Sequence, residues 1–476
     1  SAASDVYKRQ AGYQTRRGDI KRVNGKGEIM TFETKGKENN GATYGRRSDW
    51  QDLYSIAKKY YEALLADPGN AQFHLTDPRG ASDKSGRTFN NPYQYFFEQM
   101  HMDDAIYADE SIYEYPMQQG GGNDGRPYSF GRPSSGGSKA AYPCKSYGQG
   151  RINPAYFYGV FDPNDMRRDV SITMTGSNGK GVEKLIPFVP NSKAEGGGLT
   201  LNKWDENRQA NPWVAAQRKS GINGPYMRMS EVYLGYAEVC AALGDVVTGK
   251  QYLKTVRERS FPQGLANTDA FIASFGNDLV RAIIEERGFE YAGEGDRRWT
   301  LIRSGYLPED IKRIKDMTKA MMDGLATKGY YEFENGNIIS AYIWTKLVDA
   351  KTIYGHRLTA QCPTDKVNDP VLYPGWRGQK DNWEEMGLNY GSSTPATNLA
   401  IKGLFEIVSE EEAASLESQG YAKVNWGIDL VDYRDEYDKY LFWDYDYVSA
   451  PIYLWPFTPN VMAAGGFTNG YGFKQE

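Results

Sequence analysis

Apolar residues in the middle of the chain recur with helical spacing. They are Met229, Val232, Tyr236, Val239, Cys240 and Leu243. Their steps of three and four residues predict one apolar helix face, and Gly244 follows as a natural cap. A second helix is predicted from about 248 to 259 after a short turn, so the pair forms an αα-hairpin of the size found in tetratricopeptide repeats. Asn277 is expected to cap a third helix that begins near Leu279.

The amino-terminal part of the chain has a weaker pattern. Residues 11–47 are rich in Gly, Lys and Arg, and they are predicted to form a loop. Ser48 and Gln51 match a capping box, and the helical periodicity that follows ends at the turn-forming residues 67–69. A second, shorter helix is predicted within residues 92–107.

Long polar stretches and one hairpin signal separate the helical segments. Residues 118–150 are rich in Gly, Ser and Pro and are predicted to form a long loop region. The β-prone runs 170–175 and 182–189 flank an Asn-Gly turn within 176–179, which predicts a β-hairpin. A further helix is predicted over 409–419, because its Glu-rich first turns suit the helix dipole.

The composition limits the classes of function. The chain has 476 residues, a formal net charge of −5 and 14% aromatic residues, among them 36 Tyr and 10 Trp. No basic field exists to bind phosphates, so a nucleic-acid partner is disfavoured, and no apolar run is long enough to span a bilayer. Many exposed rings are typical of carbohydrate binders, in which they stack on sugars, but rings also fill protein cores.

The domain organisation follows from the absence of an obvious linker. Residues 1–476 are therefore predicted to form a single domain. Residues 1–10 are polar, lack the apolar segment of a signal peptide and fit poorly with the chain that follows. They are expected to be foreign sequence, or to stand where a natural amino-terminal part is missing.

The sharpest chemical feature is a cluster of acids and arginines. Its members are Glu285, Glu286, Arg287, Glu290, Glu294, Asp296, Arg297 and Arg298. Glu286 and Glu290 lie one helical turn apart and could serve a glycoside hydrolase as its pair of carboxylates. The interleaved arginines would instead hold both carboxylates ionised, which suits a network of structural ion pairs and not a general acid. The structural interpretation is preferred.

A small group of polar residues could bind calcium. Its members are Asp162, Asn164, Asp165 and Asp169. Their spacing matches no EF-hand loop, and Asp and Asn side chains commonly cap turns in such segments. Capping of turns is the preferred interpretation, and calcium binding stays open.

Aromatic residues in polar loops form a second group of candidate binding residues. Tyr373, Trp376, Trp383 and Tyr390 lie in a stretch rich in Gly and Asn, and Trp204 lies in a Lys-Trp-Asp-Glu-Asn segment. A Trp in a polar loop has few apolar neighbours in the sequence that could bury it. Stacking on a sugar and anchoring of the loop are therefore equally favoured for these rings.

Several motifs follow one another in a definite order along the chain. They are Asn153–Arg168, Arg228–Val239 (R-M-S-E-V-Y-L-G-Y-A-E-V), Val256–Arg259 (V-R-E-R), Glu286–Arg303, Pro451–Pro456 and Asn469–Tyr471. Their order resembles the SusD/RagB family of glycan-binding outer-membrane lipoproteins. Thr300 stands where the family carries an acid. The resemblance is clearest over 110–473, so the chain is expected to begin part-way into the fold, without the signal peptide, lipid-bearing cysteine and first helical repeats of the family.

The resemblance implies a mostly α, SusD-like fold of tetratricopeptide-type helical hairpins, with long irregular loops and a few short β-hairpins. It implies a non-catalytic protein on the extracellular face of the outer membrane. Such a protein binds oligo- or polysaccharides and delivers them to a SusC-like TonB-dependent transporter. No cofactor is implied, and contact with the membrane would require a lipid anchor that this chain lacks.

The resemblance also directs attention to aromatic residues in loops that follow the segment Glu110–Tyr113. The candidates for glycan stacking are Tyr128, Tyr142, Tyr147, Trp204, Trp376 and Trp383. Two alternatives remain. The first is a glycoside hydrolase that uses Glu286 and Glu290, and the second is a tetratricopeptide-type scaffold that binds other proteins.

Overall fold

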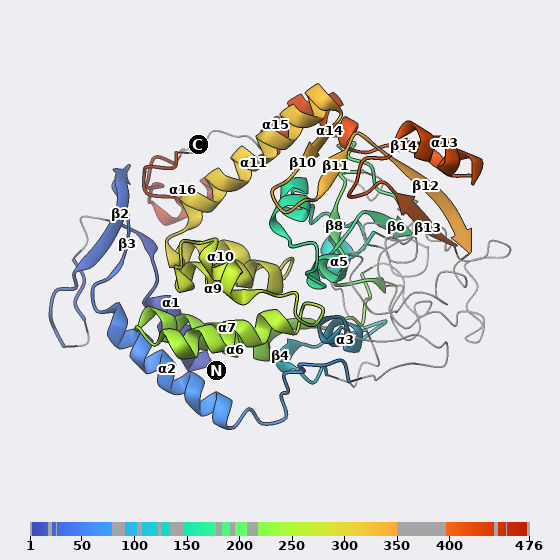
Figure 1. The fold of residues 1–476 in the computed structure, drawn as a ribbon. Coiled ribbons are helices and arrows are strands. Elements are labelled where there is room, and N and C mark those ends of the chain that lie inside the picture. Colours follow the sequence, from blue (N-terminus) through green and yellow to red (C-terminus); the bar gives the residue numbers. More distant parts are fainter. Residues whose placement is uncertain are drawn as a thin grey trace.

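The computed structural model shows a mainly helical protein with several small antiparallel sheets (Figure 1). The residues that it describes are 2–17, 21–24, 26–78, 91–101, 107–121, 126–133, 146–177, 183–190, 196–206, 218–349, 397–441, 446–453 and 455–473. The elements confirm the predicted fold class, which is mostly α with helical hairpins and short β-strands.

The centre of the molecule is helical. Its helices are α6 (Met229–Ala242), α7 (Val246–Glu258), α8 (Thr268–Ala273), α9 (Leu279–Glu290) and α10 (Asp296–Ser304). The predicted αα-hairpin is confirmed as α6 and α7, and Gly244 between them has a φ of 89°, which residues with a side chain rarely adopt. The cap of α9 differs from the prediction. The side chain of Asp278, and not that of Asn277, accepts a hydrogen bond from the Arg281 backbone NH.

Two amino-terminal helices lie beside this centre. They are α1 (Ala2–Gln10) and α2 (Trp50–Ala66). α2 approaches α6 closely because Gly235 has no side chain, since a Cβ there would clash with the Tyr61 ring. Lys8 of α1 is fully buried, and its Nζ lies 2.7 Å from a carboxylate oxygen of Glu231 in α6. Residues 2–10 are thus integrated into the packed structure.

The start of α2 corrects one prediction. Its N-cap residue is Asp49, which makes no capping hydrogen bond through its side chain. Ser48 does not form the predicted capping box, because its hydroxyl lies 2.5 Å from that of Thr31. The helix ends at Ala66, immediately before the turn predicted at 67–69.

Much of residues 11–47 forms a sheet, and the predicted loop is wrong there. The strands, in the order β1-β3-β2, are β1 (Gln14–Arg17), β3 (Ala42–Arg47) and β2 (Phe32–Asn39), with antiparallel neighbours. The local sequence did not indicate this sheet because its apolar contacts come from distant residues. Tyr13 and Tyr44 cluster with Ile302 and Ala450, and the Tyr44 hydroxyl donates to the Ile302 carbonyl.

The same sheet is joined to the carboxy-terminal part of the chain. The backbone NH of Lys37 donates to the Val448 carbonyl at 2.9 Å, and the NH of Ala450 donates to the Lys37 carbonyl at 2.7 Å. The Thr15 hydroxyl adds a hydrogen bond of 2.5 Å to the carbonyl of Pro451. Segments far apart in the sequence therefore form one edge of the molecule (Figure 1).

A long helix and a second sheet form the upper part of the view in Figure 1. The elements are α11 (Leu307–Lys328), β10 (Tyr330–Glu332), β11 (Ile338–Ser340), β12 (Tyr342–Asp349), β13 (Thr397–Lys402), α13 (Glu410–Ser418), β14 (Ala422–Asn425), α14 (Gly427–Asp432), α15 (Arg434–Leu441) and α16 (Pro459–Gly465). β12 pairs antiparallel with both β13 and β14. The predicted helix at 409–419 is confirmed as α13, which Ser409 and Glu412 cap reciprocally.

The remaining elements are short. They are α3 (Pro92–Gln99), β4 (Ser111–Tyr115), α4 (Arg126–Phe130), the π-helix η2 (Tyr156–Val160), α5 (Arg167–Ser171), β5 (Ile172–Thr173), β6 (Thr175–Ser177), β7 (Glu183–Leu185), β8 (Thr200–Leu201) and β9 (Gly224–Arg228). β6 and β7 form the predicted hairpin. Its first strand is shorter than the predicted run 170–175 and lies later, since β6 begins at Thr175 and extends into the predicted turn, whereas Val170 belongs to α5 and Ile172 pairs with β8.

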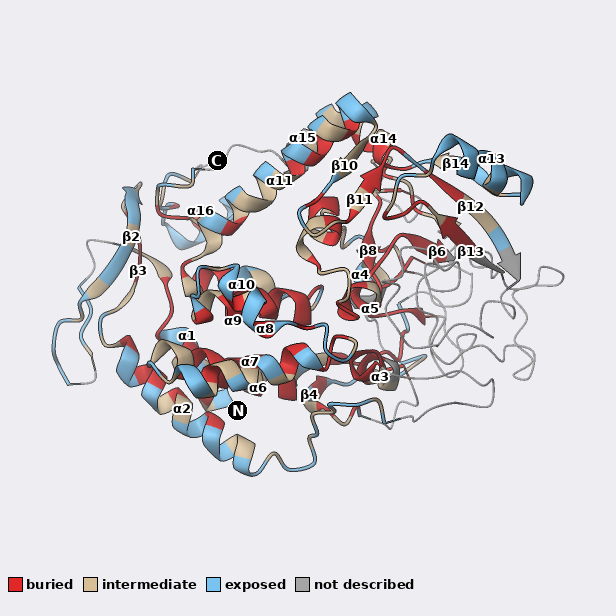
Figure 2. Cartoon of the chain, viewed as in Figure 1, coloured by how far each residue is buried: buried red, intermediate tan, exposed pale blue. Residues whose placement is uncertain are grey.

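The largest apolar core lies between η2, α11 and the β12 sheet, where buried residues concentrate in Figure 2. Trp426 is fully buried in this core, and its indole NH donates to the Tyr158 hydroxyl at 2.8 Å. A second core joins α2 to α6. The interior therefore consists of adjoining clusters that fix the helices and short sheets relative to one another.

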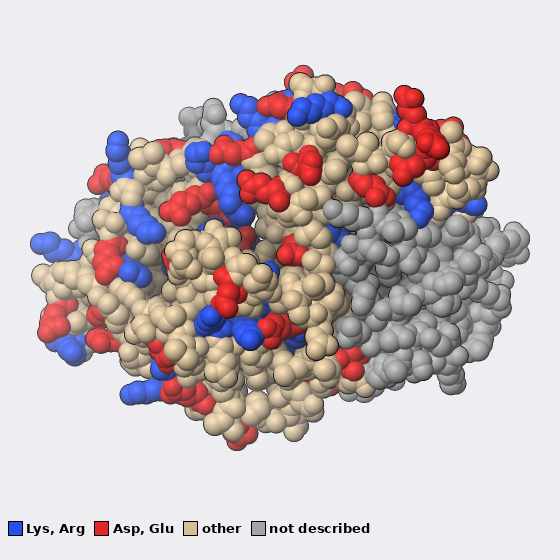
Figure 3. Space-filling model, in the orientation of Figure 1, with Lys and Arg blue, Asp and Glu red and all other residues tan. Residues whose placement is uncertain are grey.

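The surface carries charges of both signs. On the face drawn in Figure 3, Lys and Arg are interspersed with Asp and Glu, without a broad basic field. Among the described helices, none combines the length and the apolar character needed to cross a bilayer.

Candidate functional site

Glu286 and Glu290 lie within a buried network of ion pairs. Both carboxylates are fully buried, with 0% exposure. Glu290 receives hydrogen bonds from Arg259 at 2.7 Å, from Arg167 at 3.1 Å and from Arg228. The partners of Glu286 are Arg257 at 2.9 Å and Arg167 at 2.7 Å. These arginines come from α5, from the end of β9 and from the end of α7, so the network joins three separate segments to α9.

Further acids extend this network. Arg228 binds Glu110 at 3.1 Å and Glu294 at 2.9 Å. Glu294 also contacts Lys203 at 2.6 Å, and Glu110 receives a hydrogen bond of 2.6 Å from Arg259. Each acid is thus shared by two or more cations.

The network gives Glu290 the wrong properties for a general acid. Burial alone would raise the pKa of Glu290, but its arginine partners outweigh this effect and hold the pKa well below its usual range. A general acid in a glycoside hydrolase needs a raised pKa and access to its substrate. The geometry therefore supports the structural interpretation of the cluster.

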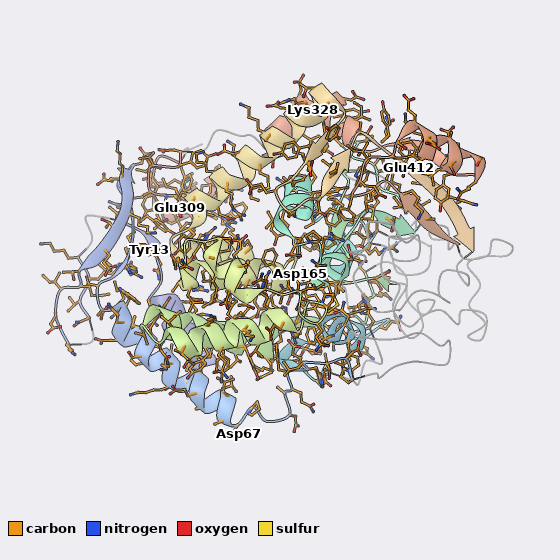
Figure 4. All side chains as sticks on the ribbon, in the orientation of Figure 1. Tyr13, Asp67, Asp165, Glu309, Lys328 and Glu412 are labelled. Atoms are coloured by element: carbon orange, nitrogen blue, oxygen red, sulfur yellow. The ribbon has the colours of Figure 1, made fainter. Side chains whose placement is uncertain are left out.

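The acidic group at 162–169 caps turns and forms ion pairs. The Asp162 carboxylate accepts from the Asn164 backbone NH at 2.8 Å, and that of Asp165 accepts from the Arg167 backbone NH at 3.0 Å. Asp165, labelled near the centre of Figure 4, also binds the Arg167 guanidinium at 2.7 Å. Within the described residues, no three or more His, Cys, Asp or Glu side chains are arranged to hold a metal ion.

Trp204 does not have the exposure that a stacking platform needs. Its side chain is 3% exposed and belongs to an apolar cluster with Tyr93, Phe96 and Leu201. The prediction of Trp204 as a glycan-stacking residue is therefore wrong. Its ring anchors the loop, which is the alternative that the sequence left open.

Tyr128 and Tyr147 lie together and are half-buried. Their ring centroids are 5.1 Å apart in an edge-to-face arrangement, and the Tyr147 backbone NH donates to the Tyr128 carbonyl at 2.8 Å. The guanidinium of Arg218 lies 4.4 Å from the centroid of the Tyr128 ring. The other candidates, Tyr142, Trp376 and Trp383, lie outside the described residues.

Three exposed tyrosines lie on the two-stranded sheet of β4 and β9, and the sequence did not single them out as binding residues. Tyr113, Tyr115 and Tyr226 are 57%, 54% and 79% exposed. The strands pair antiparallel, and the rings of Tyr113 and Tyr226 meet edge to face with centroids 5.6 Å apart. Glu114 between the tyrosines is buried and faces the interior. The alternation of the strand thus places Tyr113 and Tyr115 on the solvent face.

The pairing of these strands continues toward Tyr128. The Met117 backbone NH donates to the Asn223 side chain at 2.8 Å, and the Gly120 NH donates to the Lys219 carbonyl at 3.0 Å. Arg218 comes directly before Lys219 in the chain, and its guanidinium lies over the Tyr128 ring. We call residues 111–121 and 218–228 the tyrosine ribbon. It presents the Tyr113–Tyr226 pair at one end and the Arg218–Tyr128 contact at the other.

A separate cavity of 230 Å³ lies between α1 and α10. Trp299 and Tyr453 line it together with charged groups, but these charged groups form ion pairs. Arg9 pairs with Asp5 at 2.7 Å, and Arg287 pairs with Asp296 at 2.6 Å. The tyrosine ribbon, with its exposed rings, is the better candidate for a binding surface.

A model of the SusD family matches residues 71–456, which is more than half of the chain. The chain belongs to the SusD family. This result confirms the resemblance drawn from the motifs, and the family is one of non-catalytic, cell-surface glycan-binding proteins.

Similar proteins within the SusD family share limited identity with this chain. SusD-like protein P25 of Formosa agariphila is 28% identical over 160 residues, which cover 33% of this chain and 26% of that protein. A solved SusD homologue from Bacteroides thetaiotaomicron has 17% identity and a TM-score of 0.39, covering 56% of this chain and 52% of the other. The surface glycan-binding protein A of the same organism, solved in complex with laminarihexaose, has 19% identity and a TM-score of 0.35, covering 54% and 52%.

The match is partial in length. This SusD-family chain spans about half of those solved structures and about a quarter of P25. The motifs that carry the resemblance form the helical framework and the buried network, since Arg228, Arg259, Glu286 and Glu290 all belong to them.

Proposed function

We propose that this protein binds glycan chains at the cell surface through the tyrosine ribbon, without catalysing a reaction. We further propose that it acts on the outer face of the outer membrane and passes its ligand to a SusC-like TonB-dependent transporter. Membership of the SusD family supports both statements. The observation that carries the choice of site is the exposure of Tyr113, Tyr115 and Tyr226 on one sheet.

Ring stacking explains how the ribbon would hold a sugar chain. The face of a tyrosine ring is apolar and electron-rich, so it attracts the C–H groups on the flat side of a pyranose. A phenol hydroxyl can both donate and accept hydrogen bonds with sugar hydroxyls. Tyr113 and Tyr226 contact each other in an edge-to-face pair, so less conformational freedom is lost when a ligand binds them.

The buried network supports the absence of catalysis. The paired carboxylates that a hydrolase would need are fully buried and bound to arginines. The ribbon has one carboxylate, Glu114, which is 2% exposed and accepts hydrogen bonds from Ser111 and Asn223. Neither place offers an accessible acid and base.

Removal of both rings tests the site. The double substitution of Tyr113→Ala and Tyr226→Ala is expected to weaken polysaccharide binding by about five- to 150-fold, since each ring contact contributes about 0.5–1.5 kcal/mol. Native affinity gels cast with a panel of plant, algal and host polysaccharides measure the retardation. The melting temperature is expected to stay within about 3 °C of the parent protein, because both side chains are exposed.

Trp455 provides the matched control. It is 83% exposed and lies near α16 in the chain, outside the ribbon. Trp455→Ala is expected to keep full retardation. Unchanged retardation in the tyrosine double variant, or a joint loss of retardation and thermal stability, would assign the two tyrosines to another role.

The transporter partner has its own test. Co-expression of the full-length protein with the β-barrel transporter encoded beside its gene is expected to allow the two to be purified together in detergent. A neighbouring gene of another class, or separate elution of the two proteins, would count against the delivery step while leaving glycan binding intact.

A further inference from the structure

We propose that the tyrosine ribbon binds acidic glycans, with Arg218 as the residue that pairs with a carboxylate or sulfate on the sugar chain. This inference rests on the proposed function and specifies the class of its ligand. It is carried by the geometry of Arg218 and by the sign of the exposed charges along the ribbon.

Arg218 is held in position by stacking. Its side chain is exposed, and the guanidinium lies 4.4 Å from the centroid of the Tyr128 ring. Tyr128 is in turn braced by Tyr147 at 5.1 Å. A guanidinium that stacks on a ring keeps the N–H groups at its edge available, and these match the two oxygens of a carboxylate or sulfate.

The backbone at Arg218 also has an uncommon conformation. Its φ is +61°, in the left-handed region that residues other than Gly, Asn and Asp rarely adopt. Such conformations often occur at functional sites. Arg218 directly precedes Lys219, whose carbonyl accepts the hydrogen bond from the Gly120 backbone NH.

The exposed charges of the ribbon are all positive. Glu114 is its one acid, and it is buried and hydrogen-bonded. Arg228 is buried in the ion-pair network, whereas Arg218 and Lys219 are exposed. An anionic ligand therefore meets no exposed carboxylate on the ribbon itself.

The test uses pairs of polymers that differ only in charge. Polygalacturonate is compared with its methyl-esterified form, and dextran sulfate with dextran, by affinity gel and titration calorimetry on the parent protein. In at least one pair, the charged member is expected to bind about tenfold more tightly at low salt, and the difference is expected to shrink as salt rises.

Variants separate the inference from the proposed function. Arg218→Gln is expected to reduce binding of the charged polymer about fivefold or more and to leave the melting temperature unchanged, because one charge-assisted pair is lost at an exposed position. Arg434→Gln, at an arginine of α15 that pairs with Asp323 outside the ribbon, is the matched control and is expected to bind as the parent does. The double variant of Tyr113 and Tyr226 is expected to lose binding of both charged and neutral members.

The outcomes are distinct. A preference for the charged member in neither pair, or charged-polymer binding that Arg218→Gln leaves intact, would overturn the acidic-glycan inference. If neutral glycans still bind and this binding depends on Tyr113 and Tyr226, the proposed function is kept and only the acidic-glycan inference fails. If no polysaccharide binding depends on Tyr113 and Tyr226, the proposed function fails, and the inference fails with it.

Discussion

Substitution of Glu290 by glutamine is expected to lower the free energy of unfolding by about 3–5 kcal/mol, because it leaves buried arginines without their charge partner. Arg259 and Arg167 contact this carboxylate at 2.7 and 3.1 Å, and Arg228 binds the same group. The amide keeps the size of the side chain and removes its charge. Urea unfolding followed by circular dichroism measures the change in midpoint and slope.

An exposed ion pair provides the comparison for this change. Asp316 binds Lys312 on α11, where the two side chains are 64% and 57% exposed. Asp316→Asn is expected to change the unfolding free energy by less than about 0.5 kcal/mol, since water screens this pair. If Glu290→Gln unfolds at the same urea concentration as Asp316→Asn, the network does not hold α9 to its neighbours.

Acid is expected to unfold the protein over a defined range of pH. Burial raises the pKa of Glu238, but the charges of Arg303 and other cations outweigh it and lower the pKa to about 2. Asp310, also buried, has its pKa lowered to about 2 by Arg297 and Arg313. The pKa values of Glu231 and Glu290 are lowered as well. All of these carboxylates bind protons more tightly in the unfolded chain than in the folded one.

The sign of the pH dependence follows from these lowered values. The stabilisation is complete above the unfolded-state pKa of about 4.5 and is lost as the pH falls toward 2, because the unfolded state takes up protons first. Glu238 alone contributes on the order of 3 kcal/mol across this range, at about 1.4 kcal/mol per unit of pKa. The other lowered carboxylates act in the same direction, so acid is expected to unfold the protein.

Thermal melting at a series of pH values measures this loss. The melting temperature is expected to be nearly constant from pH 7 to pH 5 and to fall steeply between pH 4.5 and 3, in the range set by the lowered pKa values. Glu238→Gln is expected to be less stable at pH 7 and to show a shallower dependence on pH below 4.5. A melting temperature that stays level down to pH 3 would contradict the assignment of these carboxylates.

The sequence predicted the central helices well because their signal is local. In α6, Met229 and Val239 lie on one face at helical spacing, and their contacts come largely from neighbouring helices of similar pattern. The interpretation of Glu286 and Glu290 as structural also required only local information. Arginines interleaved with acids indicated that the charges would be paired.

Other elements were missed for different reasons. α11 was overlooked although Ile311, Ile314, Met321 and Leu325 recur at helical spacing within its 22 residues, a local signal that could have found it. The β1-β3-β2 sheet was missed because Tyr44 finds its partners near residues 302 and 450. The strands of this sheet show no regular alternation of apolar and polar residues within their own segments.

The candidate site could be predicted only in part. Tyr113 and Tyr115 alternate with Ile112 and Glu114, which is a short strand signal that could have marked exposed rings. Their partner Tyr226 comes from a segment more than a hundred residues away, so no local pattern places it beside them. Trp204 was misjudged because a polar stretch of sequence does not show which apolar residues will surround it in the fold.

The pairing of β2 with residues 448–450 has a consequence for biosynthesis. Asn39 donates a hydrogen bond to the carbonyl of Ala450, a residue 411 positions later. While a ribosome is still elongating the polypeptide, the edge of β2 lacks the strand-like partner that residues 448–450 will supply. Contacts of such long range form slowly, so the nascent chain keeps an open β-edge, and a risk of aggregation, until residues 448–450 have been made and can pair with β2.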